Sequence, residues 1–398
     1  MNEPKLRFKA DDGNAFPDWE EKTVGDMTVE LQDYEPLSSG YPLMTSSRTG
    51  LMMQNEFRSK SSTDDSTAIF SVVPRGVATY RHMSDDDIFH FNINNLVDKG
   101  LVSKEYPVFN TKDNYNLYLL VEYLNSSRNF LNFCKAQKKG GTRTRLYFKV
   151  LKDFKLNMPS LPEQQKIVEF LSTIDTVIEK QKETVSAWEE RKKGVMQKLF
   201  NQEVRFKADD GSDFPEWEKK PFGDIVSEFK VKTKVENEDT LLSCAINGVF
   251  LNSELFGHQR GQSNIGYLKI KKGTLILSAQ NLHLGNANVN LRFEHGIISP
   301  AYKTYDIVGC SAEYMSQWVK WDMTKQFFYN ATTVGASECR RNVDWNMLYS
   351  QLFAVPCLAE QQKIADCLSS LDEVIEKQKA TLAVWEELKK GLLQQMFV

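Results

Sequence analysis

The sequence predicts an α+β protein in which two tandem, strand-rich domains are separated and held by two long antiparallel coiled-coil helices, with pseudo-two-fold symmetry. Three observations lead to this fold class. A short segment near the start of the chain and a longer segment of helical pattern both recur about 197 residues later. The stretches between these repeats differ in sequence but share turn and strand signals. The chain therefore consists of a duplicated frame that carries two dissimilar inserts.

The repeats define the expected domains. Residues 7–22 and 205–220 are identical at twelve of sixteen positions, and residues 161–200 and 358–397 are identical at 24 of 40. Such a frame suits a protein that reads two features at a fixed separation. We expect a first domain over residues 1–160, a first helix over 161–202, a second domain over 203–357 and a second helix over 358–398.

The composition is that of a globular protein. Of the 398 residues, 41% are apolar, which is enough for two buried cores. The apolar runs are too short for a membrane-spanning helix and the first residues are polar, so we expect a cytoplasmic protein. The six cysteines show no CxxC spacing, which predicts reduced structural thiols rather than zinc ligands or disulfides.

Charge is distributed unevenly along the chain. A net charge of −3 and a pI near 6.1 by themselves argue against a nucleic-acid-binding protein. Residues 135–155, however, contain eight Lys and Arg residues and a single acidic residue, Asp153. Because phosphate binding needs a local patch rather than a basic average, this segment is a candidate nucleic-acid contact.

The long repeats carry a heptad pattern that predicts two supercoiled helices. Each would begin after Pro162 or Ala359 and extend for roughly 55 Å at 1.5 Å per residue. Gln181 and Gln378 occupy equivalent positions and would face each other in an antiparallel pair. The principal seam positions are Ile167, Leu171, Ile174, Ile178, Gln181 and Trp188 in the first repeat and Ile364, Leu368, Leu371, Ile375, Gln378 and Trp385 in the second. The pattern continues through Val185, Lys192, Val195 and Leu199, and through Leu382, Lys389, Leu392 and Met396.

The two inserts are interpreted as versions of one fold. Gly76 and Gly273 each precede a β-rich run, and residues 100–109 match residues 296–305 in their spacing. An amphipathic stretch of helical period follows in each, over residues 118–133 and 314–329, then a glycine-rich basic loop and a last strand. This order is typical of an α+β domain.

The glycine-rich loops, residues 140–145 and 335–341, are the strongest candidates for DNA contact. Arginine can bind guanine or phosphate through two hydrogen bonds, and glycine lets the backbone approach closely. The alternative is a solvated basic turn. The candidate DNA-binding residues are Lys138, Lys139, Gly141, Thr142, Arg143, Arg145, Arg340 and Arg341 in and beside these loops, and Arg58, Arg81, Arg260, Gln280 and Asn281 elsewhere in the inserts. Lys60, His82, Gln259 and His283 are weaker candidates of the same kind.

No catalytic or metal site is predicted. The chain has no Pro-Pro, and so lacks the Asn/Asp-Pro-Pro-aromatic motif of an adenine or cytosine methyltransferase, and it lacks the GxxxxGK[ST] motif of a translocase. Residues 17–22 have the letters of a metal-dependent nuclease, but residues adjacent in one short segment cannot surround a metal. The histidines show no metal-ligand spacing.

Several of these motifs resemble the specificity subunit of type I restriction-modification systems. They are PSLPEQQKI at residues 159–167 with its copy PCLAEQQKI at 356–364, the two IEKQK segments, and the FPDWEEK and FPEWEKK openings. The resemblance covers essentially the whole chain and departs at Ala359, which replaces the proline found at Pro162. It implies a noncatalytic subunit with two target recognition domains, each reading one half of a bipartite double-stranded DNA target. The helices would set the gap between the half-sites, about 34 Å or one helical turn.

The resemblance also implies partners. The subunit would dock two modification subunits, which use S-adenosylmethionine to methylate adenine, and two restriction subunits, which use ATP and Mg²⁺. The assembled complex would be a type I site-specific endonuclease and adenine methyltransferase, while this chain would need no cofactor of its own. Two alternatives stay open, a coiled-coil scaffold without a DNA role and a stand-alone DNA methyltransferase or nuclease.

Overall fold

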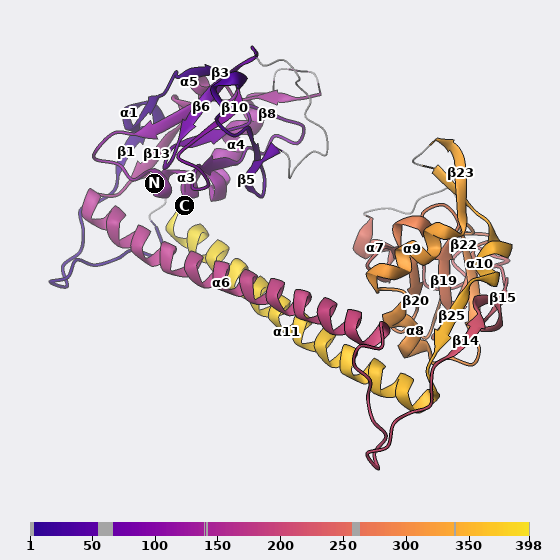
Figure 1. Ribbon diagram of the computed structural model, residues 1–398. Helices are drawn as coiled ribbons and strands as arrows, with labels where there is room; N and C mark the ends of the chain where they lie inside the picture. The colour runs from indigo at the N-terminus through magenta and orange to yellow at the C-terminus, as the bar shows by residue number, and fades with distance from the viewer. Residues whose placement is uncertain are drawn as a thin grey trace. The chain divides into compact units, whose positions relative to one another are not determined.

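The structure is a computed structural model that describes residues 4–54, 67–138, 140, 142–256, 263–337 and 340–397. The chain divides into two units: Met1–Lys182 with Ala380–Val398, and Glu183–Lys379. Each unit contains one insert together with parts of the two long helices, α6 (Leu161–Phe200) and α11 (Leu358–Met396) (Figure 1). No helix within the described ranges is long and apolar enough to cross a membrane.

Unit 1 is built on a four-stranded antiparallel sheet of order β2-β11-β7-β9. A second sheet of order β10-β6-β3 and the pairs β4-β5, β12-β8 and β1-β13 complete its strands. The strands are β1 (Glu20–Thr23), β2 (Thr28–Glu30), β3 (Tyr34–Pro36), β4 (Met44–Ser47), β5 (Gly50–Met53), β6 (Ile69–Pro74), β7 (Ala78–Tyr80), β8 (Met83–Ser84), β9 (Phe91–Ile93), β10 (Lys99–Ser103), β11 (Val108–Thr111), β12 (Thr144–Arg145) and β13 (Lys155–Met158). The helices are α1 (Val24–Met27), η1 (Leu37–Ser39), α3 (Leu117–Ser126), α4 (Arg128–Ala136) and α5 (Phe148–Leu151).

Unit 2 repeats this plan with the sheet β15-β22-β19-β20, and β18-β21, β16-β17, β23-β24 and β14-β25 as further pairs. The strands are β14 (Glu218–Pro221), β15 (Val226–Phe229), β16 (Leu242–Ala245), β17 (Gly248–Leu251), β18 (Leu268–Lys271), β19 (Leu275–Ser278), β20 (Ala287–Val289), β21 (His295–Ile298), β22 (Tyr302–Ile307), β23 (Thr332–Ser337), β24 (Arg340–Val343) and β25 (Leu352–Val355). The helices are η2 (Phe222–Asp224), α7 (Asn252–Leu255), η3 (Leu282–Leu284), α8 (Ala312–Trp318), α9 (Asp322–Asn330) and α10 (Trp345–Ser350). The prediction that both inserts share one α+β fold is confirmed.

Each unit completes its core with the start of one long helix and the end of the other. In unit 1, Ile167 and Leu171 of α6 and Met396 of α11 are buried in the cluster that contains the sheet residues Tyr80 and Phe109. In unit 2, the start of α11 supplies Ile364 and Leu368 and the end of α6 supplies Met196, Leu199 and Phe200. The long helices are therefore part of both cores, and within each unit they run antiparallel to each other, as predicted.

The heptad seam is largely confirmed but changes near the helix ends. Of the principal seam positions, Ile167, Leu171, Ile174, Ile178, Ile364, Leu368 and Ile375 are buried, and Gln181, Trp188, Leu371, Gln378 and Trp385 are half-buried. The predicted positions Val195 and Leu392 are only half-buried, because their neighbours Met196 and Leu393 enter the cores instead. Gln181 and Gln378 belong to different units, so their predicted contact stays a prediction.

Two seam lysines form ion pairs between the helices. Lys389 contacts Asp175 at 2.7 Å in unit 1, and the equivalent Lys192 contacts Asp372 at 2.6 Å in unit 2. Lys389 also contacts Glu122 of α3 at 3.0 Å, and so joins the helix pair to the insert. These contacts fix the position of one long helix against the other within each unit.

The repeated motifs of the frame meet in one contact, which we call the clasp. In unit 1 it consists of Arg7, Trp19 and Glu163: the Arg7 guanidinium donates to both Glu163 carboxylate oxygens at 3.1 and 2.9 Å, and Trp19 Nε1 donates to Glu163 Oε2 at 3.0 Å. The copy in unit 2 consists of Arg205, Trp217 and Glu360, with distances of 3.0, 2.9 and 3.0 Å. The clasp thus joins the opening motif of each half to the start of its long helix.

The helix starts differ slightly from the prediction. Both helices begin at the first residues of the expected segments, Leu161 and Leu358, which is two residues before the start expected after Pro162 and Ala359. Ala359 therefore does not change where α11 begins relative to α6. A reason is visible in the next turn, where Gln164 donates to the carbonyl oxygen of Pro159 at 2.9 Å and Gln361 donates to that of Pro356 at 2.8 Å. This contact is independent of the residue at the proline position.

Each amphipathic stretch consists of two helices. In unit 1, Ser127 has an extended backbone and its hydroxyl accepts a hydrogen bond from the Phe130 N–H at 3.3 Å, which ends α3 and begins α4. In unit 2, Trp321 is extended between α8 and α9. Serine favours the first position before a helix because its side chain satisfies a free backbone N–H. Apolar residues keep their helical spacing across both breaks, so the sequence pattern does not show where one helix ends and the next begins.

Candidate nucleic-acid interface

In unit 1 the arginine-rich segment lies beside the connection between β7 and β9. Strand β12 pairs with β8, which places Thr144 opposite Ser84 and Arg145 opposite Met83. The Leu146 N–H continues this pairing and donates to the His82 carbonyl oxygen at 2.8 Å. Two segments about 60 residues apart in the sequence therefore form one surface, on which Arg81, Arg143 and Arg145 occur together.

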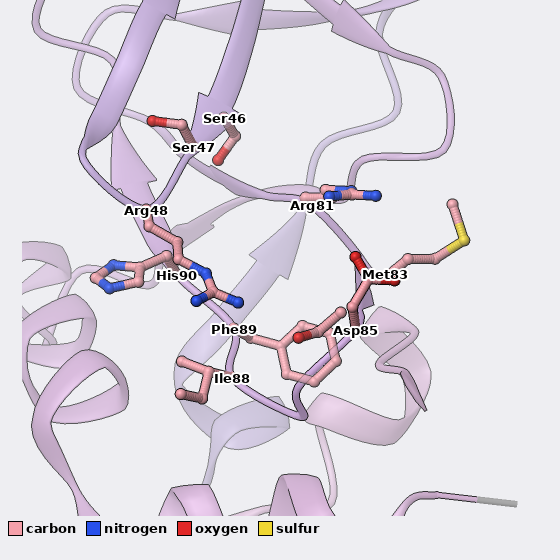
Figure 2. Close-up of a pocket in the computed structure, with 10 residues that line it drawn as sticks. Ser46, Ser47, Arg48, Arg81, Met83, Asp85, Ile88, Phe89 and His90 are labelled. Atoms are coloured by element: carbon pink, nitrogen blue, oxygen red, sulfur yellow. The ribbon is translucent and has the colours of Figure 1, made fainter. Parts of the chain in front are cut away.

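The tip of the β4-β5 hairpin adds a further arginine to this surface. Arg48, at the turn of the hairpin, lines a pocket with Arg81, Asp85 and His90 (Figure 2). The hairpin is held there by the Asn92 side-chain amide, which donates to Ser46 Oγ at 2.8 Å and to the Ser47 carbonyl oxygen at 2.9 Å. The remaining lining residues are Ser46, Ser47, Met83, Ser84, Ile88 and Phe89. Sequence reasoning missed Arg48, although its turn, Ser-Arg-Thr-Gly, was a signal of a hairpin tip.

Three consecutive aspartates form ion pairs with cations of this surface. Arg143 contacts Asp85 at 2.8 Å, Arg48 contacts Asp86 at 2.5 Å and Lys138 contacts Asp87 at 3.6 Å. The hydrogen bond from Arg48 holds the pKa of the Asp86 carboxyl below its ordinary value. Within the basic segment of residues 135–155, Lys138 and Arg143 are thus paired with acids from another part of the chain, which reduces the local positive charge.

Two histidines flank the arginines and stay neutral more readily than usual. Burial lowers the pKa of His90, and the positive charge of Arg48 lowers it further. His82 is buried, which lowers its pKa, and its ring stacks on Tyr147 with a centroid separation of 5.4 Å. Tyr147 is half exposed, so an aromatic face is available beside Arg145.

In unit 2 the equivalent segments also lie together. The β19-β20 connection, residues 279–286, carries Gln280 and Asn281, both exposed, and His283. Burial lowers the pKa of His283, and the nearby Arg341 guanidinium lowers it further. Arg341 itself lies 4.1 Å from the Tyr329 ring centroid and donates to Thr332 Oγ1 at 2.7 Å. The structure thus brings Arg341 to the same place in unit 2 that the arginine strand occupies in unit 1.

The second arginine segment is a hairpin rather than a loop. Most of residues 335–341 belong to β23 and β24, whose β-branched residues Thr332, Thr333 and Val343 favour strands. Arg340 corresponds to Arg143, because each precedes the next helix, α10 or α5, by the same number of residues. Several predicted site residues lie outside the described part of the chain, namely Arg58, Lys60, Lys139, Gly141, Gln259, Arg260 and the side chain of Arg340. Thr142 is described and exposed.

These surfaces offer hydrogen-bond donors, carboxylates and aromatic rings to a ligand. Among the residues that the structure describes, no three His, Cys, Asp or Glu side chains are arranged to hold a metal ion. The five described cysteines are free, and burial raises the pKa values of Cys134, Cys244 and Cys310 to about 12. Loops and short strands carry the arginines of these surfaces.

Comparisons with known proteins agree with this picture. Residues 89–186 match a family described as "Type I restriction modification DNA specificity domain". The specificity subunit of the type I restriction enzyme MjaVIII from Methanocaldococcus jannaschii is 24% identical over 282 residues, which cover 66% of this chain. The match spans 65% of that relative, slightly less than two thirds of its length.

Two solved structures have a similar fold. The S subunit of a type I restriction-modification system from M. genitalium aligns with a TM-score of 0.50 and 14% identity, covering 100% of this chain and 99% of that chain. A chain from a structure that describes complex assembly and conformational transition of the type I R-M system aligns with a TM-score of 0.51 and 14% identity, covering 96% and 98%. The duplicated α+β frame with two long helices is thus a fold of restriction-modification S subunits. The chain is thus similar to type I restriction-modification specificity subunits, in sequence over part of its length and in fold over nearly all of it.

Proposed function

We propose that this chain is the noncatalytic DNA-specificity subunit of a type I restriction-modification complex, in which each unit reads one half of a bipartite duplex target. One observation carries the proposal. The two units share the same clasp and the same sheet, yet the connections beside their arginines, residues 81–90 and 279–286, differ in length and in side chains. A common frame with different contact residues is what reading two different half-sites requires.

The long helices and the partners complete the proposal. Helix α6 passes from the first insert to the second, and its 40 residues correspond to about 60 Å. The helices would set the gap between the half-sites and dock two modification subunits, and two restriction subunits would join the complex. S-adenosylmethionine, ATP and Mg²⁺ would be used by these partners in the cytoplasm, and this chain would hold no cofactor.

The first test is to co-express the chain with the modification subunits of its host and to map methylated adenines by single-molecule sequencing. We expect one new motif with two defined halves and a fixed gap. A stable complex that methylates nothing new would contradict the DNA-reading role, and the absence of any complex would favour the scaffold alternative. Methylation or cleavage by the purified chain alone, with S-adenosylmethionine or Mg²⁺, would favour the enzyme alternative.

A chimera tests the assignment of one half-site to each unit. The first and last strands of each insert pair with each other, β1 with β13 and β14 with β25, so each insert has a defined entrance and exit. Replacing residues 20–158 by residues 218–355 should therefore preserve the fold and yield a motif with two inverted copies of the second half-site. The reciprocal exchange is the matched control and should give two copies of the first. A motif unchanged by either exchange would show that the inserts do not read the target.

A further inference from the structure

We propose that Asp85, Asp86 and Asp87 of unit 1 determine specificity by restraining the cations beside them, so that contact with phosphates alone binds DNA weakly. This inference rests on the proposed DNA-reading function. It concerns residues of acidic type, which sequence reasoning about a basic patch leaves aside. The consequence is a prediction about discrimination between DNA sequences rather than about affinity alone.

The three ion pairs connect the aspartates to three different elements. Arg48 comes from the β4-β5 turn, Lys138 from the end of α4, and Arg143 from the segment before β12. Thr144 Oγ1 also donates a hydrogen bond to Asp87. Each aspartate therefore pairs with a cation from a different segment. The three aspartates thus connect the segments that form the candidate surface of unit 1.

The pairs are accessible to a ligand. The side chains of Arg143 and Asp85 are 50% and 62% exposed, and those of Arg48 and Asp86 are 58% and 43% exposed. Such exposed pairs contribute little to folding stability, so stability does not account for these two adjacent pairs. Their position on the candidate interface points instead to an effect on binding.

A phosphate and a base edge would meet these pairs differently. A phosphate that takes the arginine leaves the aspartate beside another anion, which is unfavourable. A base pair can satisfy both partners, because guanine O6 and N7 accept from arginine while cytosine N4 donates to a carboxylate. Contacts that penalise the wrong ligand are a common source of specificity. The aspartates would thus weaken sequence-independent binding more than binding to the target.

The corresponding connection of unit 2 differs in sequence from that of unit 1 and serves as an internal comparison. This connection, residues 279–286, contains no Asp or Glu. Arg341 is held there by the Tyr329 ring and by Thr332, which are neutral partners. We therefore expect the restraint in unit 1 and not in unit 2.

The experiment uses the complex of the full chain with its modification subunits and compares wild type with Asp85→Asn and Asp86→Asn. Dissociation constants are measured over a salt series for a duplex with the methylated motif's sequence and for one with unit 1's half-site scrambled. Each substitution should tighten binding to the scrambled duplex by about two- to five-fold, the range for an exposed ion pair. The slope of log affinity against log salt should become steeper by about 0.9 for each cation that gains a phosphate. Asp85→Glu should restore the wild-type ratio between the two duplexes.

Asp98→Asn is the matched control, because Asp98 pairs with Arg75 at 3.0 Å on the same unit but at the opposite end of β7. It should leave both duplexes unaffected. The inference would be overturned if both aspartate variants bound the scrambled duplex with the wild-type affinity and salt slope. It would also be overturned if Asp98→Asn tightened binding to the scrambled duplex as much as the Asp85 and Asp86 variants do. Failure of the wild-type complex to bind any duplex would instead refute the proposed function.

Discussion

Replacing Arg7 with methionine should destabilise unit 1 far more than an ordinary surface substitution. Glu163 is fully buried, and its carboxylate accepts hydrogen bonds from the Arg7 guanidinium and from Trp19 Nε1. Methionine keeps the apolar stem of the side chain but removes the charge and two of these donors. The carboxylate would then be buried with a single neutral donor.

The magnitude follows from this uncompensated charge. Removing one partner of a buried ion pair costs about 3–5 kcal/mol, which is a large part of the roughly 5–15 kcal/mol that stabilises a typical domain. Arg75→Met is the control, because the Arg75–Asp98 pair is exposed and should contribute less than about 1 kcal/mol. Arg205→Met should repeat the large effect in unit 2, since the clasp is duplicated there.

The assay must report on each unit separately, because a protein of two units need not unfold in one step. Hydrogen exchange followed by mass spectrometry, over a urea series, gives the opening free energy of peptides at the start of α6 and of α11. Arg7→Met should lower protection at the start of α6, and Arg205→Met at the start of α11. Adding Glu163→Gln to Arg7→Met should recover at least about 1.5 kcal/mol, as for other close charge pairs. A loss in Arg7→Met no larger than in Arg75→Met would refute the reasoning.

Three further predictions concern stability. Gly296→Ala should cost about 1–3 kcal/mol by overpacking, because a Cβ at this position would overlap the Leu242 side chain; an unchanged melting temperature would contradict it. Burial lowers the pKa of Lys320 to about 8 from 10.5, so between these pH values the unfolded chain holds the extra proton and the free energy of unfolding rises with pH. In Lys320→Met the free energy of unfolding, measured with urea at pH 7 and pH 9.5, should not show this rise. The same pH dependence in the variant as in the wild type would contradict the prediction. Lys389→Met should cost about 3–5 kcal/mol, because it leaves the partly buried carboxylates of Asp175 and Glu122 without their cation; loss of less than 1 kcal/mol by chemical denaturation would be inconsistent with this.

Much of the frame could be predicted because its signals are local. Apolar residues at heptad spacing fix a helix and its buried stripe whatever the helix packs against, and the burial of Ile167, Leu171 and Ile178 follows from that spacing. The likeness between the inserts was also readable, since glycines and β-branched residues mark turns and strands over a few residues. The positions of the breaks at Ser127 and Trp321 could not be predicted, because the apolar period continues across them.

The candidate interface was predicted only in part. Arg143 and Arg145 could be named from the sequence because glycine and basic residues occur together there. Arg48 and the aspartates could not be named in this way. Arg48 is 38 residues from Asp86 in the sequence, and Arg143 is 58 residues from Asp85. Their encounter depends on the pairing of β8 with β12 and on the docking of the β4-β5 hairpin.

The sequence by itself determined that this chain is a duplicated frame of two long helices with two α+β inserts, because repeats, heptads and turns are properties of residues close together in the chain. Only the tertiary structure decided what the repeated Arg, Trp and Glu do, since Arg7 and Glu163 are 156 residues apart and become partners only when the helix packs on the insert. It likewise decided that Lys138 and Arg143 of the basic segment pair with Asp87 and Asp85. Electrostatic pairing depends on distance in space, which sequence separation does not give.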